Sequence, residues 1–375
     1  MYKRKIDDII AKYIGNKEFI ILFGARQIGK TTTLNNLFSN NQDALIFNCE
    51  RPEILQILEN FNISELKLLF GDKKIIALDE AQCVPNIGKV LKLIYDSPEF
   101  TQKIIATGSS SFDLSNKINE PLTGRNLKFK MFPLSYQEIV EHKTWLWCKE
   151  NIDELLIFGS YPGVIDKPIS EKPKYLSNLS SDYLFKDVLA LENIKNPLVL
   201  RKLLQLLAWQ IGSEVSMNEL AMQLGISMKT VEKYIDLLEK SFVIFGLHSF
   251  SRNMRNELKK SRKYYFFDLG IRNALINNFS GLSSRTDKGA IWENFCISER
   301  YKNNETSSIL KNMYFWRTYD GAEIDLVEEK DGNIECFEFK ISAKRKTAFP
   351  QSFEEAYKPK SNLIVSPENV HEFLL

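Results

Sequence analysis

A glycine-rich segment near the start of the chain constrains its fold more than any other feature. Residues 24–31, Gly-Ala-Arg-Gln-Ile-Gly-Lys-Thr, fit the phosphate-loop pattern G-x-x-x-x-G-K-S/T. The apolar run 19–23 before them is typical of a buried parallel strand, and residues 31–38 have helical apolar spacing. A strand, a glycine loop and a helix N-terminus in this order direct backbone N–H groups at phosphates. The sequence therefore predicts a site for a nucleoside triphosphate.

The loop residues have distinct predicted roles. Lys30 would reach the β- and γ-phosphates, and the hydroxyl of Thr31 would hold Mg²⁺. The predicted nucleotide-binding residues are Gly24, Ala25, Arg26, Gln27, Ile28, Gly29, Lys30, Thr31 and Thr32.

Five apolar, β-rich runs indicate the sheet to which this loop belongs. They lie at 19–23, 44–48, 74–78, 103–107 and 127–132. Segments with helical spacing separate the first four runs. This order predicts right-handed β-α-β crossovers and a parallel sheet that is covered on both faces.

Polar side chains follow two of these runs. Asp79 and Glu80 end the third run, where Asp79 could bind Mg²⁺ opposite Thr31 and Glu80 could polarise the attacking water. Thr107 and Ser109 end the fourth run and could sense the γ-phosphate or orient water. Simpler interpretations remain open, because strands often meet solvent at acidic residues or end in Gly-Ser turns.

Composition limits the remaining classes of function. A chain of 375 residues predicts two to four domains, and a net charge of +2 confines any nucleic-acid surface to a local patch. Five scattered cysteines without C-x-x-C, and only three histidines, argue against zinc sites and disulfides and favour the cytoplasm. No apolar stretch of about 18 residues is present, so we expect no membrane association.

Several segments together resemble the AAA+ ATPases. They are the phosphate loop, the strand that ends in Asp79-Glu80, the Ala-Thr-Gly-Ser-Ser segment at 106–110, and Leu-Thr-Gly-Arg at 122–125 before 132–138. More narrowly, they resemble a bacterial and archaeal group with a winged helix and a C-terminal domain of unknown function. The resemblance implies a homo-oligomer in which Arg125 completes the nucleotide site as a finger or sensor. A surface arginine far from the phosphates is the alternative.

The middle of the chain has helical patterns. Residues 136–196 are interrupted by Gly-Ser-Tyr-Pro-Gly at 159–163, and the resemblance implies a helical lid here, with this turn as a packing corner. Farther on, helical spacing at 217–224 and 230–240 flanks a turn at Gly225, and an apolar run at 242–250 follows. This order is typical of a helix-turn-helix with the start of a wing, and the resemblance also implies a winged helix.

Basic residues in and after this region could contact DNA phosphates without reading sequence. The predicted residues are Lys229, Lys233, Arg252, Arg255, Lys259, Lys260, Arg262 and Lys263. A winged helix used for domain docking, beside a solvated charged loop, is the alternative.

The C-terminal region carries a pattern of acids and a lysine. Glu338 and Lys340 would share one face of a strand, and Asp325 would lie on the preceding strand of a hairpin that turns at 330–333. The two acids and the carbonyl of Phe339 could hold a second Mg²⁺ or Mn²⁺, and with the lysine beside them they could activate water for phosphodiester cleavage. This region resembles the PD-(D/E)xK nuclease fold, which implies that Glu293 on a helix joins the site. A domain that only binds, or a solvated strand face, would show the same pattern.

The sequence thus predicts an α/β protein with four parts. They are an AAA+ core with a P-loop and a parallel sheet at 1–135, a helical lid at 136–196, a winged helix at 197–262 and a restriction-endonuclease-like α/β domain at 263–375. We expect a Mg²⁺-dependent ATPase that acts as a switch or motor on DNA, with metal-dependent nuclease activity in the last domain as a further expectation. The competing hypothesis is a non-enzymatic adaptor that binds ATP and docks protein or DNA.

Overall fold

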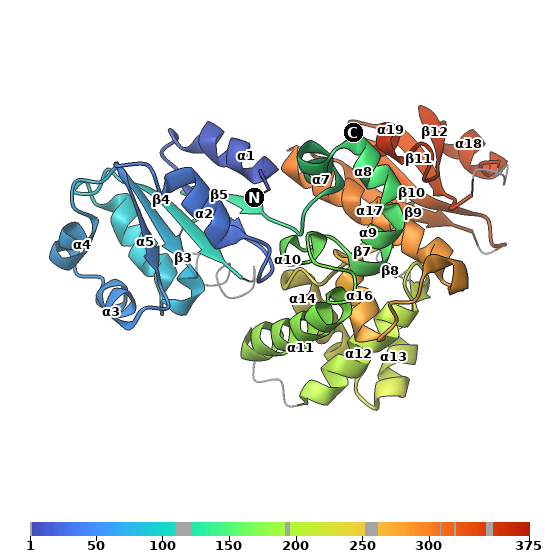
Figure 1. Ribbon diagram of the computed structural model, residues 1–375, viewed down its shortest axis with the longest axis horizontal. Helices are drawn as coiled ribbons and strands as arrows, with labels where there is room; N and C mark the ends of the chain where they lie inside the picture. The colour runs from blue at the N-terminus through green and yellow to red at the C-terminus, as the bar shows by residue number, and fades with distance from the viewer. Residues whose placement is uncertain are drawn as a thin grey trace. The chain divides into compact units, whose positions relative to one another are not determined.

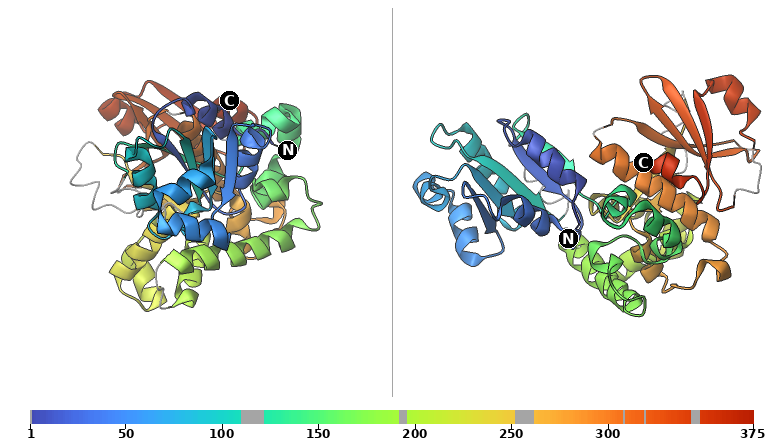
Figure 2. Two further views of the ribbon diagram at one scale, coloured as in Figure 1. Left: turned by 90° about the vertical axis from the view of Figure 1, so that its left-hand side faces the viewer. Right: turned by 45° about the horizontal axis from the view of Figure 1, so that its top comes forward.

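The computed structural model describes residues 2–109, 122–191, 196–251, 262–307, 309–318, 320–342 and 348–375; for 182–191 it describes the backbone alone. The chain divides into two compact units (Figures 1 and 2). The first comprises Met1–Pro133, Ala190–Glu192 and Lys240–Phe242, and the second comprises Leu134–Leu189, Asn193–Glu239 and Val243–Leu375.

The first unit contains a five-stranded parallel sheet in the order β2-β3-β4-β1-β5. Its strands are β1 (Phe19–Phe23), β2 (Ala44–Asn48), β3 (Ile75–Asp79), β4 (Lys103–Gly108) and β5 (Asn126–Lys130). Its helices are α1 (Lys5–Tyr13), α2 (Lys30–Phe38), α3 (Pro52–Asn60), α4 (Ile63–Phe70), η1 (Ala81–Cys83) and α5 (Ile87–Asp96). Successive residues of β1 and β4 are buried, so both faces of these strands are covered. The predicted parallel sheet is confirmed.

The register of this sheet brings the ends of three strands to one edge. Phe23 at the end of β1 lies beside Gly108 of β4, and Leu78 of β3 lies beside Ala106 of β4. Polar residues that follow these strands must therefore meet at the carboxyl edge, where ligands bind in open parallel sheets.

The second unit contains a mixed seven-stranded sheet in the order β12-β11-β10-β9-β7-β8-β6. Its strands are β6 (Glu214–Val215), β7 (Ile244–Ser249), β8 (Arg262–Phe266), β9 (Asn312–Arg317), β10 (Glu323–Lys330), β11 (Asn333–Phe339) and β12 (Ser361–Val365). Only the β7–β9 and β11–β12 pairs of the described sheet are parallel. The long helix α17 (Lys288–Thr306) contacts β8 and β11 (Figure 2).

The second unit also contains shorter and longer helices besides α17. They are α7 (Tyr136–Lys143), α8 (Trp145–Glu150), α9 (Ile152–Phe158), α10 (Pro162–Ile165), α11 (Lys172–Leu191), α12 (Pro197–Trp209), α13 (Met217–Leu224), α14 (Met228–Lys240), α16 (Leu269–Leu275), η2 (Leu282–Ser284), α18 (Gln351–Tyr357) and α19 (Val370–Leu374). The two helices predicted around Gly225 form, and this glycine ends α13 with a left-handed φ of 66°.

One sheet joins the two regions that the sequence predicts as separate winged-helix and nuclease-like domains. Strand β7 pairs with β9 through His248 beside Tyr314 and Ser249 beside Phe315. The predicted boundary between residues 262 and 263 falls inside β8. Hydrogen bonds between strands distant in sequence therefore make these regions parts of one folded unit.

The Gly-Ser-Tyr-Pro-Gly turn packs against the start of α16. A Cβ atom on Gly159 would lie 2.3 Å from an oxygen of Asp268, and one on Gly270 would lie 2.1 Å from the carbonyl oxygen of Phe158. Asp268 accepts hydrogen bonds from the backbone N–H groups of Ser160, at 2.7 Å, and Ile271, at 3.0 Å. The turn is therefore a packing corner in which the glycines allow close backbone approach.

Candidate functional site

The glycine loop lies between β1 and α2 and has a tightly fixed backbone. Gln27 and Gly29 have left-handed φ angles of 59° and 100°, a conformation that glycine adopts without strain. A Cβ atom on Gly24 would lie 2.3 Å from the carbonyl oxygen of Met131. Lys30 begins α2, and its ammonium donates to the carbonyl oxygens of Gly24 and Ala25, both at 2.8 Å.

The side chains of the loop differ in accessibility. Gly24, Ala25, Ile28 and Lys30 are buried, whereas Gln27, Thr31 and Thr32 are exposed and Arg26 is half-buried. The exposed hydroxyls follow Lys30 in the first turn of α2, where backbone N–H groups lack helical partners and favour an anion.

Arg4 supports the loop from outside the predicted motif. This buried arginine donates from Nη1 to the carbonyl oxygen of Ile28 and from Nη2 to that of Phe132, each at 2.7 Å. It thereby ties the phosphate loop to the residues after β5. Sequence reasoning missed Arg4 because a single arginine before a helix carries no local signal of such distant partners.

Asp79 lies between two hydroxyl groups at the carboxyl edge of the sheet. Thr31 Oγ1 donates to Asp79 Oδ2 at 2.6 Å, and Thr107 Oγ1 donates to Asp79 Oδ1. Hydroxyl and carboxylate oxygens are the hard ligands that Mg²⁺ prefers, and Mg²⁺ commonly uses one or two carboxylates with substrate phosphates. Thr31 and Asp79 therefore fit the predicted Mg²⁺ pair.

Glu80 follows Asp79 in a left-handed backbone conformation with φ of 53°. Its N–H donates to Thr107 Oγ1 at 3.2 Å, and its Oε2 accepts from the amide nitrogen of Gln82 at 2.5 Å. The same nitrogen donates to Ser109 Oγ at 3.2 Å. The structure thus brings Asp79, Glu80, Thr107 and Ser109 together as predicted, and it adds Gln82, which sequence reasoning missed.

A buried thiol lies beside this cluster. The backbone N–H of Cys49 donates to the carbonyl oxygen of Asp79 at 2.9 Å. Burial, and next the nearby Cys83, raise the pKa of the Cys49 thiol to about 12. The thiol is therefore neutral at physiological pH and adds no charge beside the carboxylates.

Arg125 lies at the opposite edge of the sheet from the phosphate loop. It precedes β5, and its carbonyl oxygen accepts from Phe19 N–H at the amino end of β1. The loop follows the carboxyl end of the five-residue β1, about 17 Å away at 3.3 Å per residue. The guanidinium contacts Asp96 through Nε at 2.9 Å and Nη2 at 3.3 Å. A sensor role toward its own nucleotide does not fit this position.

The predicted DNA-binding residues fall into three groups. Lys229 and Lys233 are exposed on α14. Arg252, Arg255, Lys259 and Lys260 lie outside the described residues. Arg262 and Lys263 begin β8, where Arg262 is half-buried and Lys263 is 1% exposed.

The surroundings of Lys263 contradict the prediction that this residue contacts DNA. Its ammonium pairs with Glu293 Oε1 at 3.3 Å and with Glu323 Oε1. Although burial alone would lower it, the charges of Glu293 and Glu323 raise the pKa of Lys263 above its usual value. The lysine is therefore committed to internal ion pairs and is not available to DNA phosphates.

The predicted acids and lysine of the C-terminal hairpin come together. Lys340 Nζ lies 2.6 Å from Glu338 Oε2 and 3.6 Å from Asp325 Oδ2. Asp325 Oδ2 also accepts from Phe339 N–H at 2.8 Å. Burial and the neighbouring Asp325 raise the pKa of the Glu338 carboxyl above its usual value.

Glu293 lies in the adjoining part of this cluster. Tyr265 donates its hydroxyl to Glu293 Oε1 at 2.7 Å, and Lys263 contacts the same oxygen. Burial raises the pKa of Glu293 to about 7, although Lys263 opposes this effect. Lys263 and Lys340 thus form ion pairs with Glu293 and Glu338. Within the described ranges, no group of three or more His, Cys, Asp or Glu residues is placed to hold a metal ion.

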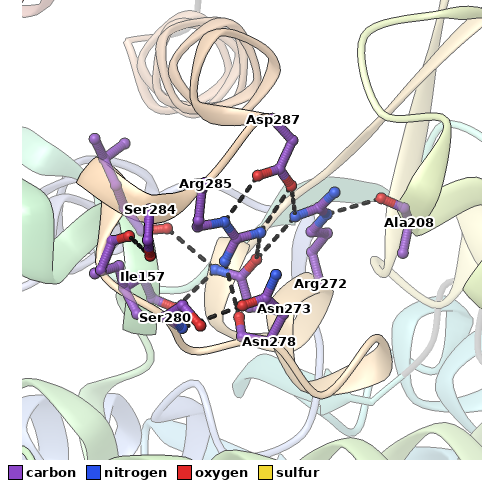
Figure 3. A network of polar contacts seen from close by, with 11 residues as sticks. Ile157, Ala208, Arg272, Asn273, Asn278, Ser280, Ser284, Arg285 and Asp287 are labelled. Atoms are coloured by element: carbon purple, nitrogen blue, oxygen red, sulfur yellow. Dashed lines mark hydrogen bonds and ion pairs between the residues drawn. The ribbon is translucent and has the colours of Figure 1, made fainter.

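A second ionic network fastens helices of the second unit (Figure 3). Arg272 and Arg285 each contact Asp287 Oδ2 at 2.7 Å, and Arg285 also donates to Asn273 Oδ1 at 3.1 Å. Asn273 in turn donates to the carbonyl oxygen of Ile157 at 2.8 Å. Burial would raise the pKa of Asp287, but the two guanidinium groups hold it at about 2. The network joins α9, α16 and the start of α17.

Comparisons with known proteins agree with the phosphate-loop geometry. Residues 16–140 match the family model described as AAA domain, and residues 149–282 and 288–373 match two domains of unknown function, DUF8612 and DUF4143. The chain is similar to the uncharacterized protein Rv2008c of Mycobacterium tuberculosis, with 27% identity over 86% of this chain and 70% of the relative. It is also similar to the uncharacterized protein MJ1544 of Methanocaldococcus jannaschii, with 26% identity over 94% and 81%.

A solved structure shows the same fold. The Walker-type ATPase PABY2304 of Pyrococcus abyssi aligns with a TM-score of 0.52 and 16% identity, over 74% of this chain and 96% of that one. Residues 16–140 therefore match an AAA domain, and the chain shares its fold with a Walker-type ATPase. Among the described helices, none is long and apolar enough to cross a membrane.

Proposed function

We propose that the first unit binds ATP with Mg²⁺ and hydrolyses it. The observation that carries this proposal is the chain of contacts at the carboxyl edge of the sheet, from Thr31 through Asp79 to Thr107 and the backbone of Glu80. These groups lie beside a phosphate loop, so a metal position at Thr31 and Asp79 and a water-activating carboxylate at Glu80 would adjoin one anion site.

Each residue would have one task in this reaction. The Lys30 ammonium would exchange the carbonyl oxygens of Gly24 and Ala25 for phosphate oxygens. Thr31 and Asp79 would hold Mg²⁺, which neutralises charge on the β- and γ-phosphates. Glu80 would accept the proton of the attacking water.

Two variants of the first unit test this proposal. Lys30→Ala should weaken nucleotide binding because it removes a phosphate contact, whereas Glu80→Gln should bind ATP and turn over slowly. Glu65→Gln, an exposed carboxylate on α4, is the matched control. Phosphate release and binding of a fluorescent ATP analogue would be measured. Wild-type turnover by Glu80→Gln would contradict the role of Glu80.

Arg125 supports a proposal about assembly. We infer that the protein works as a homo-oligomer in which Arg125 of one copy completes the nucleotide site of the next. The supporting observation is its position at the amino edge of the sheet, remote from the phosphate loop of its own chain. An arginine delivered by a neighbouring copy would stabilise charge in the transition state.

The second unit supports a proposal about DNA. We infer that ATP hydrolysis drives a switch or motor that acts on DNA, which the exposed Lys229 and Lys233 on α14 would contact through phosphates. The competing hypothesis is an adaptor that binds ATP but hydrolyses it poorly. Turnover measured with and without duplex DNA separates them, because a DNA-directed motor should be stimulated and an adaptor should not.

For the C-terminal cluster, we propose a domain that binds without cleaving. Lys263 and Lys340 already take the positions beside the carboxylates where a metal would be needed. The contrary hypothesis is a nuclease that uses Mg²⁺ or Mn²⁺ at Asp325 and Glu338, with Glu293 and Lys340. Metal-dependent cleavage of DNA that is lost in Asp325→Asn would establish that hypothesis instead.

A further inference from the structure

Gln82 joins two groups of the candidate ATPase site through a single nitrogen atom. It lies half-buried in η1, directly after the strand that carries Asp79 and Glu80. Its amide nitrogen donates to Glu80 Oε2 at 2.5 Å and to Ser109 Oγ at 3.2 Å. Glu80 follows β3 and Ser109 follows β4, so the amide links the ends of two neighbouring strands.

The backbone holds Gln82 in position for this contact. The left-handed Glu80, with φ of 53° and ψ of 41°, begins the 3-10 turn of η1, and Cys83 N–H closes the turn on the carbonyl oxygen of Glu80 at 3.0 Å. The N–H of Glu80 is itself fixed by Thr107 Oγ1. A turn anchored at Glu80 therefore brings the side chain at position 82 back over the carboxylate at position 80.

The chemistry of an amide suits this position. An amide N–H donated to a carboxylate oxygen fixes the orientation of the carboxylate without adding a charge. One carboxylate oxygen of Glu80 then serves as the anchor, and the other can accept the proton of the attacking water. A lysine here would cancel the negative charge of Glu80, and a glutamate would repel it.

We propose that Gln82 is a positioning residue for ATP hydrolysis. It orients the Glu80 carboxylate and couples it to Ser109 through the shared amide nitrogen. This inference rests on the proposed ATPase function. It predicts that Gln82 affects the chemical step and leaves nucleotide binding unchanged, because Gln82 contacts Glu80 and Ser109 while the glycine loop binds the phosphates.

Three variants test the inference in the full chain. Gln82→Ala and the length-matched Gln82→Met both remove the N–H, and Gln82→Glu replaces it with a negative charge. We expect the first two to lower kcat by roughly tenfold to a hundredfold, the range for a hydrogen bond to a charged group. The dissociation constant of a fluorescent ATP analogue should stay within about twofold. Gln42→Ala, at an exposed position in the same unit, is the control and should match the wild type.

A comparison of kcat with nucleotide affinity separates positioning from a general loss of structure. A positioning role lowers kcat and leaves the dissociation constant of the ATP analogue unchanged, and Gln82→Glu should lower kcat farther because its negative charge repels the Glu80 carboxylate. A merely structural role would weaken nucleotide binding together with kcat. Thermal melting confirms folding, and Gln82→Met preserves the length of the side chain if Gln82→Ala does not fold.

The outcomes for Gln82 and for the ATPase proposal can be told apart. If Glu80→Gln turned over at the wild-type rate, the proposed function itself would be wrong. If Glu80→Gln stalled while Gln82→Met kept the wild-type kcat, only the role of Gln82 would be overturned. A fall in kcat with unchanged nucleotide affinity supports the inference.

Discussion

The acidic clusters of the two units differ in the partners that contact their charged groups. In the first unit, Asp79 accepts hydrogen bonds from two neutral hydroxyls, and Lys30 donates to backbone carbonyls. In the second unit, Glu338 and Glu293 contact the ammonium groups of Lys340 and Lys263. These groups of the first unit contact neutral partners, whereas those of the second unit contact oppositely charged side chains. Similar residue types thus have different electrostatic surroundings in the two units.

The largest expected effect concerns the arginine that would complete the first site. We expect Arg125→Ala to bind ATP normally and to lose roughly 10³-fold in turnover, because such an arginine stabilises transition-state charge. Wild-type turnover per subunit should rise with protein concentration. Arg51→Ala, an exposed arginine in the same unit, is the control.

Complementation sharpens this test. If Arg125 acts on the next copy, a mixture of Arg125→Ala and Glu80→Gln subunits forms some sites with both groups intact, so turnover should partly recover. A monomer with concentration-independent turnover, or a mixture that stays inactive, would contradict the assignment to a neighbouring copy.

The second expected effect tests whether an ammonium replaces a metal in the C-terminal cluster. Lys340→Ala leaves Asp325 and Glu338 facing each other, so we expect it to reduce the free energy of unfolding by about 2 kcal/mol. Mn²⁺ should then restore part of that loss, because a divalent ion relieves the repulsion. Urea unfolding would be followed by tryptophan fluorescence with and without Mn²⁺, in the absence of nucleotide.

The wild type provides the contrast for this variant. Its unfolding midpoint should not respond to Mn²⁺ through this cluster, since Lys340 already lies beside both acids. An increase in wild-type stability that Asp325→Asn abolishes would instead reveal a metal site and favour the nuclease hypothesis.

The raised pKa of Glu293 predicts that the free energy of unfolding depends on pH. Burial raises its pKa in the folded protein to about 7 from the ordinary value of 4.5. Between these two values the folded state binds more protons than the unfolded state, so stability falls as the pH rises from about 4.5 to 7. We expect Glu293→Gln to remove a decline on the order of 2 kcal/mol across this range. Urea unfolding of both proteins at several pH values measures the difference, and parallel curves would contradict it.

The smallest expected effect concerns lysines of the second unit that are exposed. Lys229 and Lys233 lie on the surface of α14, unlike Lys263 and Lys340. If they contact duplex DNA, replacing both with alanine should reduce the salt dependence of binding by about 0.9 in log–log slope for each lost contact. Lys174 and Lys288, both exposed elsewhere in the unit, form the control pair. Equal slopes for the two double variants would favour protein docking over DNA contact.

Local patterns predicted much of the first unit. The runs at 19–23 and 44–48 match β1 and β2, and the Asp79-Glu80 pair meets the phosphate loop as expected. Short apolar runs that alternate with helical segments leave few topologies for a parallel sheet. Arg4 and Gln82 were not predicted, because their contacts depend on where separate segments meet and on a left-handed turn at Glu80.

Local patterns predicted less of the second unit. The hairpin of β10 and β11 and its turn at 330–333 form as expected, but Lys263 is buried although it stands in a basic run. A strand pattern shows which residues share a face and does not show which face another element covers. The pairing of β7 with β9 likewise joins strands that are far apart in the sequence.

The sequence by itself determined the phosphate loop, the parallel strands and the acids at their ends. These features follow from backbone preferences, glycine conformations and hydrophobic periods, which act over a few neighbouring residues. Only the tertiary structure decided which partners surround each charged side chain. Long-range packing buries Lys263 beside Glu293, sets Lys340 against Glu338 and leaves Asp79 between two hydroxyls. Burial and the partner that packing supplies decide whether a charged group binds a ligand or stabilises the fold.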